Sequence, residues 1–162
     1  MEFLRGQKTH DKIWDQACQL YDDGDVKALC HTLQDDYNCD VNIMLILAVL
    51  ESIGMVPTND SLTDLIEVSD EWQEEILRPI RRGRLDLKPF KAGQGLYDIV
   101  KGMELIVERE EYNNLFEKLH LVPASRQLRS QIEPYILRRA GDNKPIPDLS
   151  AFEKASRSVR LA

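Results

Sequence analysis

The hydrophobic positions of this chain recur at intervals of three and four residues, which is the spacing of side chains that share one face of an α-helix. Residues 41–53 differ because they are apolar on nearly every side of a helix. Such a helix is either buried in a core or spans a membrane, and this run is shorter than the roughly 20 residues that a span needs. We therefore predict a central core helix over residues 41–53.

Polar and special residues mark the two ends of this helix. Asp40 is placed to accept hydrogen bonds from the unpaired backbone N–H groups of the first turn. Gly54 suits the left-handed position just past the last turn, and Pro57 follows at a position where the helix could not continue.

Amphipathic stripes predict further helices on both sides of the central one. The stripes are Trp14, Ala17, Cys18 and Tyr21; Val26, Leu29, Cys30 and Leu33; Leu62, Leu65, Ile66, Trp72, Ile76, Leu77 and Ile80; Leu96, Ile99, Val100, Met103, Ile106 and Val107; and Leu128, Ile132, Tyr135 and Ile136. In the first half of the chain, we expect a helix cap at Asp25 and a capping box at Ser61 and Asp64, and the helix that follows should kink or stop at Pro79 and close at Gly83. A connector over 84–95 should lead into a helix from about residue 96 to about residue 120. We then expect a helix that starts at Pro123, bends at Pro134 and ends at Gly141, and a last helix that starts with a capping box at Ser150 and Glu153.

No strand-like alternation of apolar and polar residues is found, so we expect an all-α fold. The expected architecture is a single-domain bundle of six to seven helices around the central helix. Residues 1–141 would form the helical domain. Residues 142–162 would form a C-terminal tail with a short helix, which either docks on the same domain or stays mobile.

Charge and cysteine content refine this picture. The net charge is −7, but residues 1–77 hold 17 acidic and 4 basic side chains, whereas residues 78–162 hold 11 acidic and 17 basic ones. The two halves either neutralise each other or present an acidic and a basic face, one of which meets a partner. Three cysteines without a CxxC pair, Cys18 and Cys30 on apolar faces, and a mostly polar start favour a cytoplasmic protein with core thiols and no membrane segment.

Several short motifs occur together between residue 12 and about residue 120. They are Trp14, Tyr21, Leu33, Gln34 and Asp35, Asp40, Val41 and Asn42, Pro79, Arg81, Arg84, Lys101, Glu104 and Leu105, and Glu108 and Arg109. With these motifs the chain resembles a family of short, helical proteobacterial proteins, domain of unknown function 2390. The resemblance implies the all-helical fold and an uncharacterised cytosolic protein, and it carries no activity over to this chain.

A cluster of basic residues gives two competing interpretations. Arg78, Arg81 and Arg84 share one helix face and Lys88 follows, which is a geometry suited to grip phosphate or carboxylate. Glu104 and Glu108, one turn apart on the next helix and followed by Arg109, would instead pair with the arginines in an inter-helix ion network. The network is the favoured interpretation, and a pocket for an anionic ligand is the alternative.

Other polar residues favour structural roles over chemistry. Asp35, Asp36 and Asp40 match the aspartate-rich, Mg²⁺-binding pattern of helical prenyl-transferring enzymes, but we see no second acidic motif and expect capping and turn roles instead. Gln34 and Asn42 would satisfy backbone groups beside the central turn. His10, His31 and His120 share no metal-ligand spacing, and no nucleophile elbow or phosphate-binding glycine loop is found, so neither a catalytic site nor a metal or cofactor is expected.

Three functional hypotheses remain from the sequence. The leading one is a non-enzymatic module that binds another protein, and it predicts an exposed apolar patch. The second is binding or turnover of an anionic small molecule at the arginines, which predicts guanidinium groups free of carboxylate partners. The third is association with RNA or the ribosome through the basic half, which the overall acidity disfavours.

Overall fold

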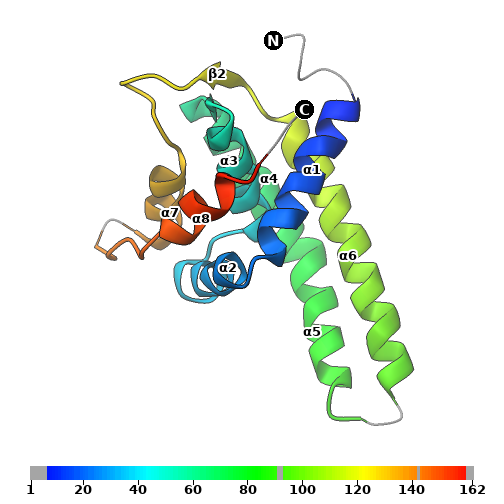
Figure 1. Ribbon diagram of the computed structural model, residues 1–162. Helices are drawn as coiled ribbons and strands as arrows, with labels where there is room; N and C mark the ends of the chain where they lie inside the picture. The colour runs from blue at the N-terminus through cyan, green and yellow to red at the C-terminus, as the bar shows by residue number, and fades with distance from the viewer. Residues whose placement is uncertain (1–6, 91–92, 142, 160–162) are drawn as a thin grey trace. The chain divides into compact units, whose positions relative to one another are not determined.

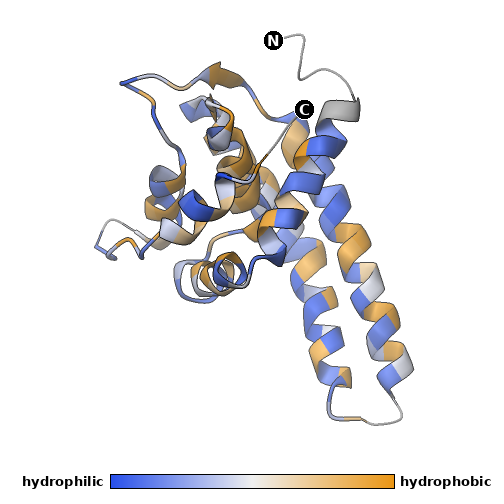
Figure 2. Ribbon diagram, in the orientation of Figure 1, coloured by the Kyte–Doolittle hydropathy of each residue, from blue (hydrophilic) through white to orange (hydrophobic). Residues whose placement is uncertain are grey.

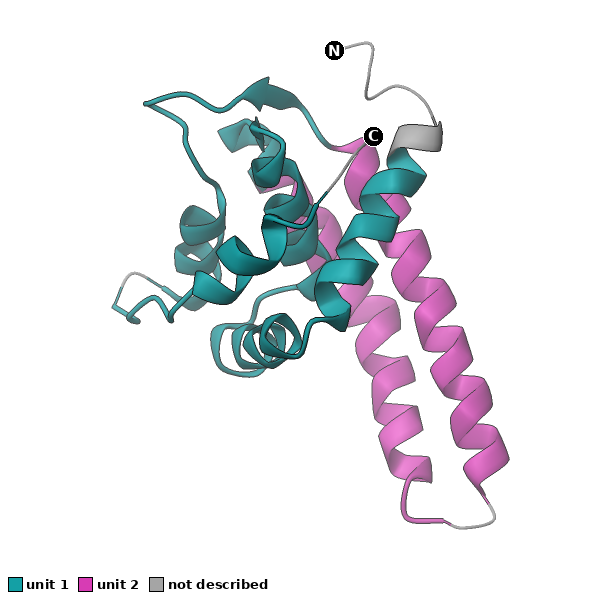
Figure 3. Ribbon diagram, viewed as in Figure 1, with its two compact units in different colours: residues 1–62, 119–162 teal, residues 63–118 magenta. Residues whose placement is uncertain are grey.

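The computed structural model describes residues 7–90, 93–141 and 143–159, and Figure 1 shows their elements in chain order. These residues divide into two units: residues 1–62 with 119–162, and residues 63–118 (Figure 3). The elements are α1 (Gln7–Asp22), α2 (Gly24–Tyr37), α3 (Val41–Ser52), β1 (Met55–Pro57), α4 (Asn59–Trp72), a π-helical turn η2 (Gln73–Leu77), α5 (Arg78–Leu87), α6 (Gln94–Glu117), β2 (Leu121–Pro123), α7 (Ile132–Ala140) and α8 (Ser150–Ser156). The expected all-α class is confirmed.

The central helix of the first unit is α3, as the sequence predicts. Every residue from Ile43 to Leu50 is buried, and α3 contacts α1, α2, α7, α8 and β1. Asp40 caps its start, since the carboxylate accepts from the backbone N–H of Asn42 at 2.7 Å. Gly54 follows the helix with φ of +75°, a conformation that glycine adopts without strain.

A two-stranded antiparallel sheet in the first unit is absent from the sequence prediction. Met55 pairs with Pro123 and Pro57 with Leu121. The ladder is extended by hydrogen bonds from the Ala124 N–H to the Gly54 carbonyl at 2.8 Å and from the Thr58 N–H to the His120 carbonyl at 2.9 Å. Strands of three residues are too short to show alternation in the sequence. The expected helix start at Pro123 was therefore wrong, because Pro123 ends β2.

At three helix starts, the residue predicted as the cap lies inside the helix, and an earlier polar side chain binds the first turn. Asp23, and not Asp25, caps α2 by accepting from the N–H groups of Asp25 and Val26. For α4, the Thr58 hydroxyl accepts from the Ser61 N–H, whereas Ser61 lies inside the helix. Before α8, the Asp148 carboxylate accepts from the Ser150 N–H at 2.9 Å. In each case the residue closer to the preceding loop supplies the oxygen.

The second unit continues as a helix through the residues where a stop was expected. The helix widens to a π-helical turn over Gln73–Leu77, where the Arg78 N–H reaches the Gln73 carbonyl, and Pro79 follows in the first turn of α5. Proline has no N–H to donate to the preceding turn and would disrupt a regular α-helix, and here it directly follows the wider π-helical turn. Gly83 lies inside α5 and ends nothing, so the expected closure at Gly83 and the connector from residue 84 were wrong.

Helix α7 begins later than expected and ends where expected. Pro134 lies in its first turn rather than at an interior bend, and the Gln131 carbonyl accepts from the Tyr135 N–H. Glu51 of α3 accepts from the Gln131 N–H at 2.8 Å and from the Ser130 hydroxyl at 3.0 Å, so this carboxylate binds the polar start of α7. Gly141 ends the helix with φ of +83°.

The buried face of α1 differs from the predicted stripe. Ile13, Ala17 and Leu20 are buried, whereas Cys18 is exposed. The expectation of a core thiol at Cys18 was wrong because the helix is rotated by about one residue from the predicted face. Cys30 is buried as expected, and Cys39 is buried beside the turn before α3.

The C-terminal tail contributes α8 to the first unit. Phe152 is buried, and α8 contacts α1, α2 and α3. The loop before it is held by the Tyr37 hydroxyl, which donates to the Pro145 carbonyl at 2.9 Å, and by the Lys144 ammonium, which lies 4.2 Å from the Tyr37 ring centre. Residues 142 and 160–162 of the tail lie outside the described residues.

Among the described helices, none combines the length and the apolar content that a bilayer crossing requires.

Candidate functional site

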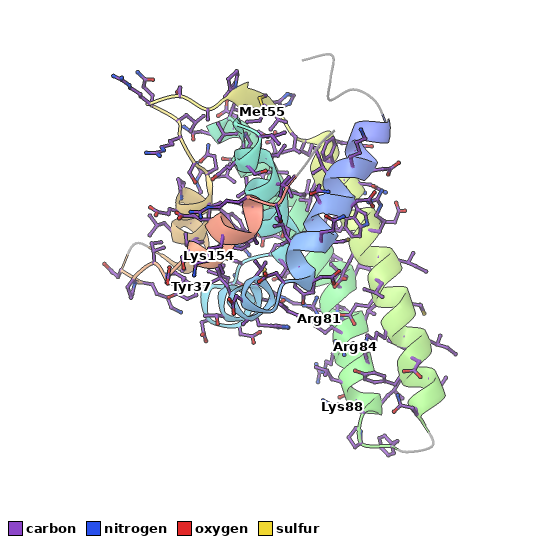
Figure 4. All side chains as sticks on the ribbon, in the orientation of Figure 1. Tyr37, Met55, Arg81, Arg84, Lys88 and Lys154 are labelled. Atoms are coloured by element: carbon purple, nitrogen blue, oxygen red, sulfur yellow. The ribbon has the colours of Figure 1, made fainter. Side chains whose placement is uncertain are left out.

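Two of the basic residues predicted from the sequence, Arg81 and Arg84, lie on α5 opposite carboxylates of α6 within the second unit. Figure 4 labels Arg81 and Arg84 along α5 and Lys88 just past its end. Arg81 and Arg84 are three residues apart and therefore share one face, while Glu104 and Glu108 are one turn apart on α6. The antiparallel course of the two helices sets these faces against each other.

Glu104 is the centre of this ion network. Its side chain is 8 % exposed, and it accepts from Nε of Arg81 at 3.0 Å and from Nε and Nη2 of Arg84. Arg81 also donates through Nη2 to Glu108 at 3.5 Å. One buried carboxylate therefore holds two guanidinium groups, which offsets the cost of removing the three charges from water.

Arg84 is the most engaged of the arginines. Besides Glu104, it donates to the Tyr97 hydroxyl at 3.0 Å and stacks on that ring, with 5.6 Å between guanidinium carbon and ring centre. The hydrogen bond to Glu104 raises the pKa of Arg84 above its ordinary value, so the side chain is charged at every accessible pH. An anion at this position would have to displace Glu104.

The remaining basic candidates make contacts of other kinds. Arg78 pairs with Glu74 of the preceding turn at 2.9 Å, and both side chains are at least half exposed. Lys88 is exposed at the end of α5. Arg109, expected as a member of the network, lies over the Tyr112 ring at 5.2 Å. The structure therefore brings Arg81 and Arg84 together and leaves Arg78 and Lys88 at the surface.

The polar residues of the central turn hold backbone rather than forming a pocket for chemistry. The Tyr135 hydroxyl accepts from the Asp40 N–H at 2.7 Å, and Arg139 donates to the Asn38 carbonyl at 2.9 Å. Burial raises the pKa of Tyr135 well above its ordinary value, so its hydroxyl stays protonated. Asn38 adopts a left-handed conformation with φ of 56°.

The other residues predicted for this turn take surface or part-buried positions. Asp35 and Asp36 are exposed near the end of α2, Gln34 is half-buried, and Asn42 lies in the first turn of α3. The aspartates of the predicted metal pattern do not converge. Within residues 7–90, 93–141 and 143–159, no group of three or more histidine, cysteine or carboxylate side chains is placed to hold a metal ion.

Two further polar residues of the second unit escaped the sequence analysis. Gln73, in the π-helical turn, donates to Glu111 of α6 at 3.1 Å, and Glu111 is fully buried. Unlike Glu104, Glu111 follows two other acidic residues, so the sequence alone offered no reason to single it out.

A second feature of α6 lies on the side away from α5. Four apolar residues, which we call the α6 stripe, are 50–66 % exposed: Leu96, Ile99, Met103 and Ile106. Figure 2 shows hydrophobic segments alternating with hydrophilic ones along the α6 ribbon. The sequence predicted this stripe as a packing face, but the charged side of the helix is the one that meets α5. The side of α6 that meets α5 is therefore charged, and the α6 stripe is exposed.

Large exposed apolar residues are confined to this hairpin among the described residues. Leu85 of α5, Phe90 in the turn and Leu105 of α6 complete the set, each at least half exposed. Soluble proteins scatter such residues singly, whereas a contiguous group marks an interaction surface. The α6 stripe therefore joins the ion network as a candidate functional feature.

Comparison with known proteins gives a family match. The model of a family described as "Protein of unknown function (DUF2390)" matches residues 12–115, a range that includes the whole α6 stripe and the ion network. No curated protein and no solved structure matches the chain.

Proposed function

The chain belongs to the DUF2390 family, and from that premise we propose that it is a non-enzymatic protein-interaction module that binds its partner through the α6 stripe. The exposed stripe is the observation that carries this proposal. Four large apolar side chains in a row on one helix expose to water an apolar surface that a partner helix would cover. Burial of such apolar area is the main driving force of association.

The ion network supports the same proposal. Arg81 and Arg84, which would hold an anion, are already bound to Glu104 and Glu108. Their pairing joins α5 to α6 through the charged side of α6 and leaves the α6 stripe exposed for a partner.

The cysteines favour a reducing compartment for this module. Cys18, Cys30 and Cys39 form no disulfide, and Cys30 and Cys39 lie in the core. We therefore include cytoplasmic localisation in the proposal.

Capture experiments with matched variants test the proposal. Tagged wild-type protein, Ile99→Glu and Leu105→Glu are used to capture proteins from the native extract at low and high salt. Ile99 lies in the α6 stripe, whereas Leu105 is a similarly exposed apolar residue on another side of the same helix. We expect a salt-resistant partner that Ile99→Glu loses and Leu105→Glu keeps. A partner that both variants retain would contradict the proposed surface.

The two other hypotheses have their own outcomes in the same experiment. Binding of an anionic molecule at Arg78, Arg81, Arg84 and Lys88 stays a prediction, and Arg78→Glu should weaken such binding without affecting the α6 stripe. RNA association predicts retained nucleic acid only at low salt, because counterion release makes phosphate contacts strongly salt-dependent.

A further inference from the structure

The spacing of the α6 stripe is the same in both directions along the helix. Leu96 and Ile99 are three residues apart, Ile99 and Met103 four, and Met103 and Ile106 three. This is the a/d spacing of a coiled-coil seam, about three turns long. The stripe is symmetric about residue 101. In an antiparallel copy of the helix that is rotated about this point, the apolar residues therefore lie opposite apolar residues.

We propose that the partner of the α6 stripe is a second copy of this chain, packed antiparallel about a two-fold axis near residue 101. A two-fold interface requires a surface that complements itself, and this symmetric spacing provides one. The axis sets Leu96 against Ile106 of the partner subunit and Ile99 against Met103 of the partner subunit. The inference rests on the proposed function and adds the identity of the partner.

The surroundings of the stripe fit a second helix. Gly95 and Gly102 lie along one edge of the stripe, and a Cβ added at either would meet nothing within 4 Å. The space beside the seam is therefore open, and a helix can approach closely where no side chain intervenes. Val100 and Val107 line the other edge and add apolar area.

Charge does not oppose the antiparallel pairing. Lys101 lies at the level of the axis, where a residue in the seam would meet its own copy. At about 100° per residue it falls on the opposite side of the helix from Ile99 and Met103. The two copies of Lys101 therefore point away from each other, and the seam contains only apolar residues from Leu96 to Ile106.

The size of the seam sets the expected strength. Stable interfaces bury about 800 Å² per partner, which four half-exposed side chains do not reach. We expect a reversible dimer with a Kd of about a micromolar or weaker. The dimer would therefore form and dissociate within an ordinary range of protein concentration.

Sedimentation velocity over low to high micromolar concentrations tests the dimer, with circular dichroism to check folding. The wild type should shift from monomer to dimer as its concentration rises. Ile99→Glu should raise the Kd at least tenfold, since it places two carboxylates near the axis. Leu105→Glu should change the Kd less than threefold, because Leu105 lies off the stripe.

A double variant tests the antiparallel direction. In Ile99→Glu/Met103→Lys, antiparallel pairing sets each new carboxylate against a new ammonium, so dimerisation should return toward the wild-type Kd. Parallel pairing would set like charges together and keep the protein monomeric.

A wild type that remains monomeric at all concentrations, or a dimer that Ile99→Glu leaves unchanged, would overturn the inference. A different result would contradict the proposed function: a capture experiment in which Ile99→Glu loses none of the proteins that the wild type retains. A monomer whose capture of a different protein still requires Ile99 would retain the function and reject the second copy as the partner.

Discussion

At the scale of single residues, Glu104 shows how burial selects a partner. A carboxylate beside an apolar stripe needs a cation, and Arg81 and Arg84 supply two. The sequence indicated this pairing because the residues recur at i, i+3 and i, i+4 on adjacent helices. The sequence did not predict the hydrogen bond from Arg84 to Tyr97, because a single tyrosine among polar residues forms no periodic pattern.

The network predicts the effect of reversing one charge. Arg81→Glu places a carboxylate against Glu104 and Glu108 and should lower the free energy of unfolding by about 2 kcal/mol. Arg82→Glu, at an exposed position of the same helix, is the matched control and should change it by less than about 0.5 kcal/mol. Urea unfolding measures both, and equal midpoints for the two variants would contradict the network.

The three cysteines should differ in reactivity. Cys18 is exposed, whereas burial raises the pKa of Cys30 and of Cys39 to about 12. The thiolate is the reactive form, so the buried thiols should be inert near neutral pH. A thiol reagent should label one cysteine rapidly in the native protein and all three in denaturant. Rapid labelling of two or three native cysteines would argue against the described core.

Glu51 should give the stability a measurable pH dependence. Burial raises the pKa of its carboxyl, and hydrogen bonds from Gln131 and Ser130 offset part of the shift. The folded protein then holds this proton more tightly than the unfolded chain, so stability falls as pH rises from about 4.5 through the folded-state pKa. Glu51→Gln cannot ionise and should lose that slope while keeping an acceptor oxygen.

The measurement is the difference in free energy of unfolding between wild type and Glu51→Gln at several pH values. This difference should move in favour of the variant as pH rises. A difference that is constant with pH would contradict the raised pKa.

At the scale of elements, helices were easier to predict than their first residues. The helix α3 is apolar on all sides, and no other element fits that pattern. The helices α2, α4 and α8 start in stretches with two or more capping residues, such as Asp23 and Asp25. Which one adopts the extended cap conformation depends on tertiary packing, so propensity alone left the choice open.

The helix α6 shows a second limit of patterns. Periodicity identified an apolar side and a charged side, but not which of them meets α5. Apolar sides normally face inward, and that rule gave the wrong orientation here because the charges of α5 and α6 complement each other. If a partner covered the apolar side of α6, that side would be buried, as apolar helix faces normally are.

Docking of α8 can be tested with two phenylalanines. Phe152→Ala removes a side chain that is 3 % exposed and should cost about 3 kcal/mol of unfolding free energy. Phe90→Ala removes one that is 64 % exposed and should cost less than about 0.5 kcal/mol. Thermal or urea unfolding distinguishes them, and equal costs would mean that α8 adds nothing to the core.

At the scale of the whole molecule, buried apolar side chains are concentrated in the first unit. Between Leu77 and Tyr112, no apolar side chain of the described residues is buried, whereas α3 contributes eight buried residues. Regions with few buried contacts open more readily than the core. The two-unit division escaped the sequence analysis because charge pairing, and not composition, closes the α5–α6 hairpin.

Hydrogen exchange should follow this division. Amides near the end of α5 and the start of α6 should exchange at least tenfold faster than those of α3. Glu104→Gln should accelerate exchange in the hairpin and leave α3 unchanged, because it weakens only the ion network. Uniform protection across both units would contradict the expected gradient.

The short sheet of β1 and β2 has a consequence for how this chain can change over evolution. Residues 58 and 120 are joined by a backbone hydrogen bond, and His120 also donates its N–H to the Ser61 hydroxyl at 3.0 Å. The chain thus leaves the first unit and returns to it next to this hydrogen-bonded pair, so residues 63–118 are connected to the first unit as an insertion would be. Changes in the length or surface of the α5–α6 hairpin should therefore leave the pairing of β1 with β2 in place, so a new binding surface can arise there without a change in the first unit.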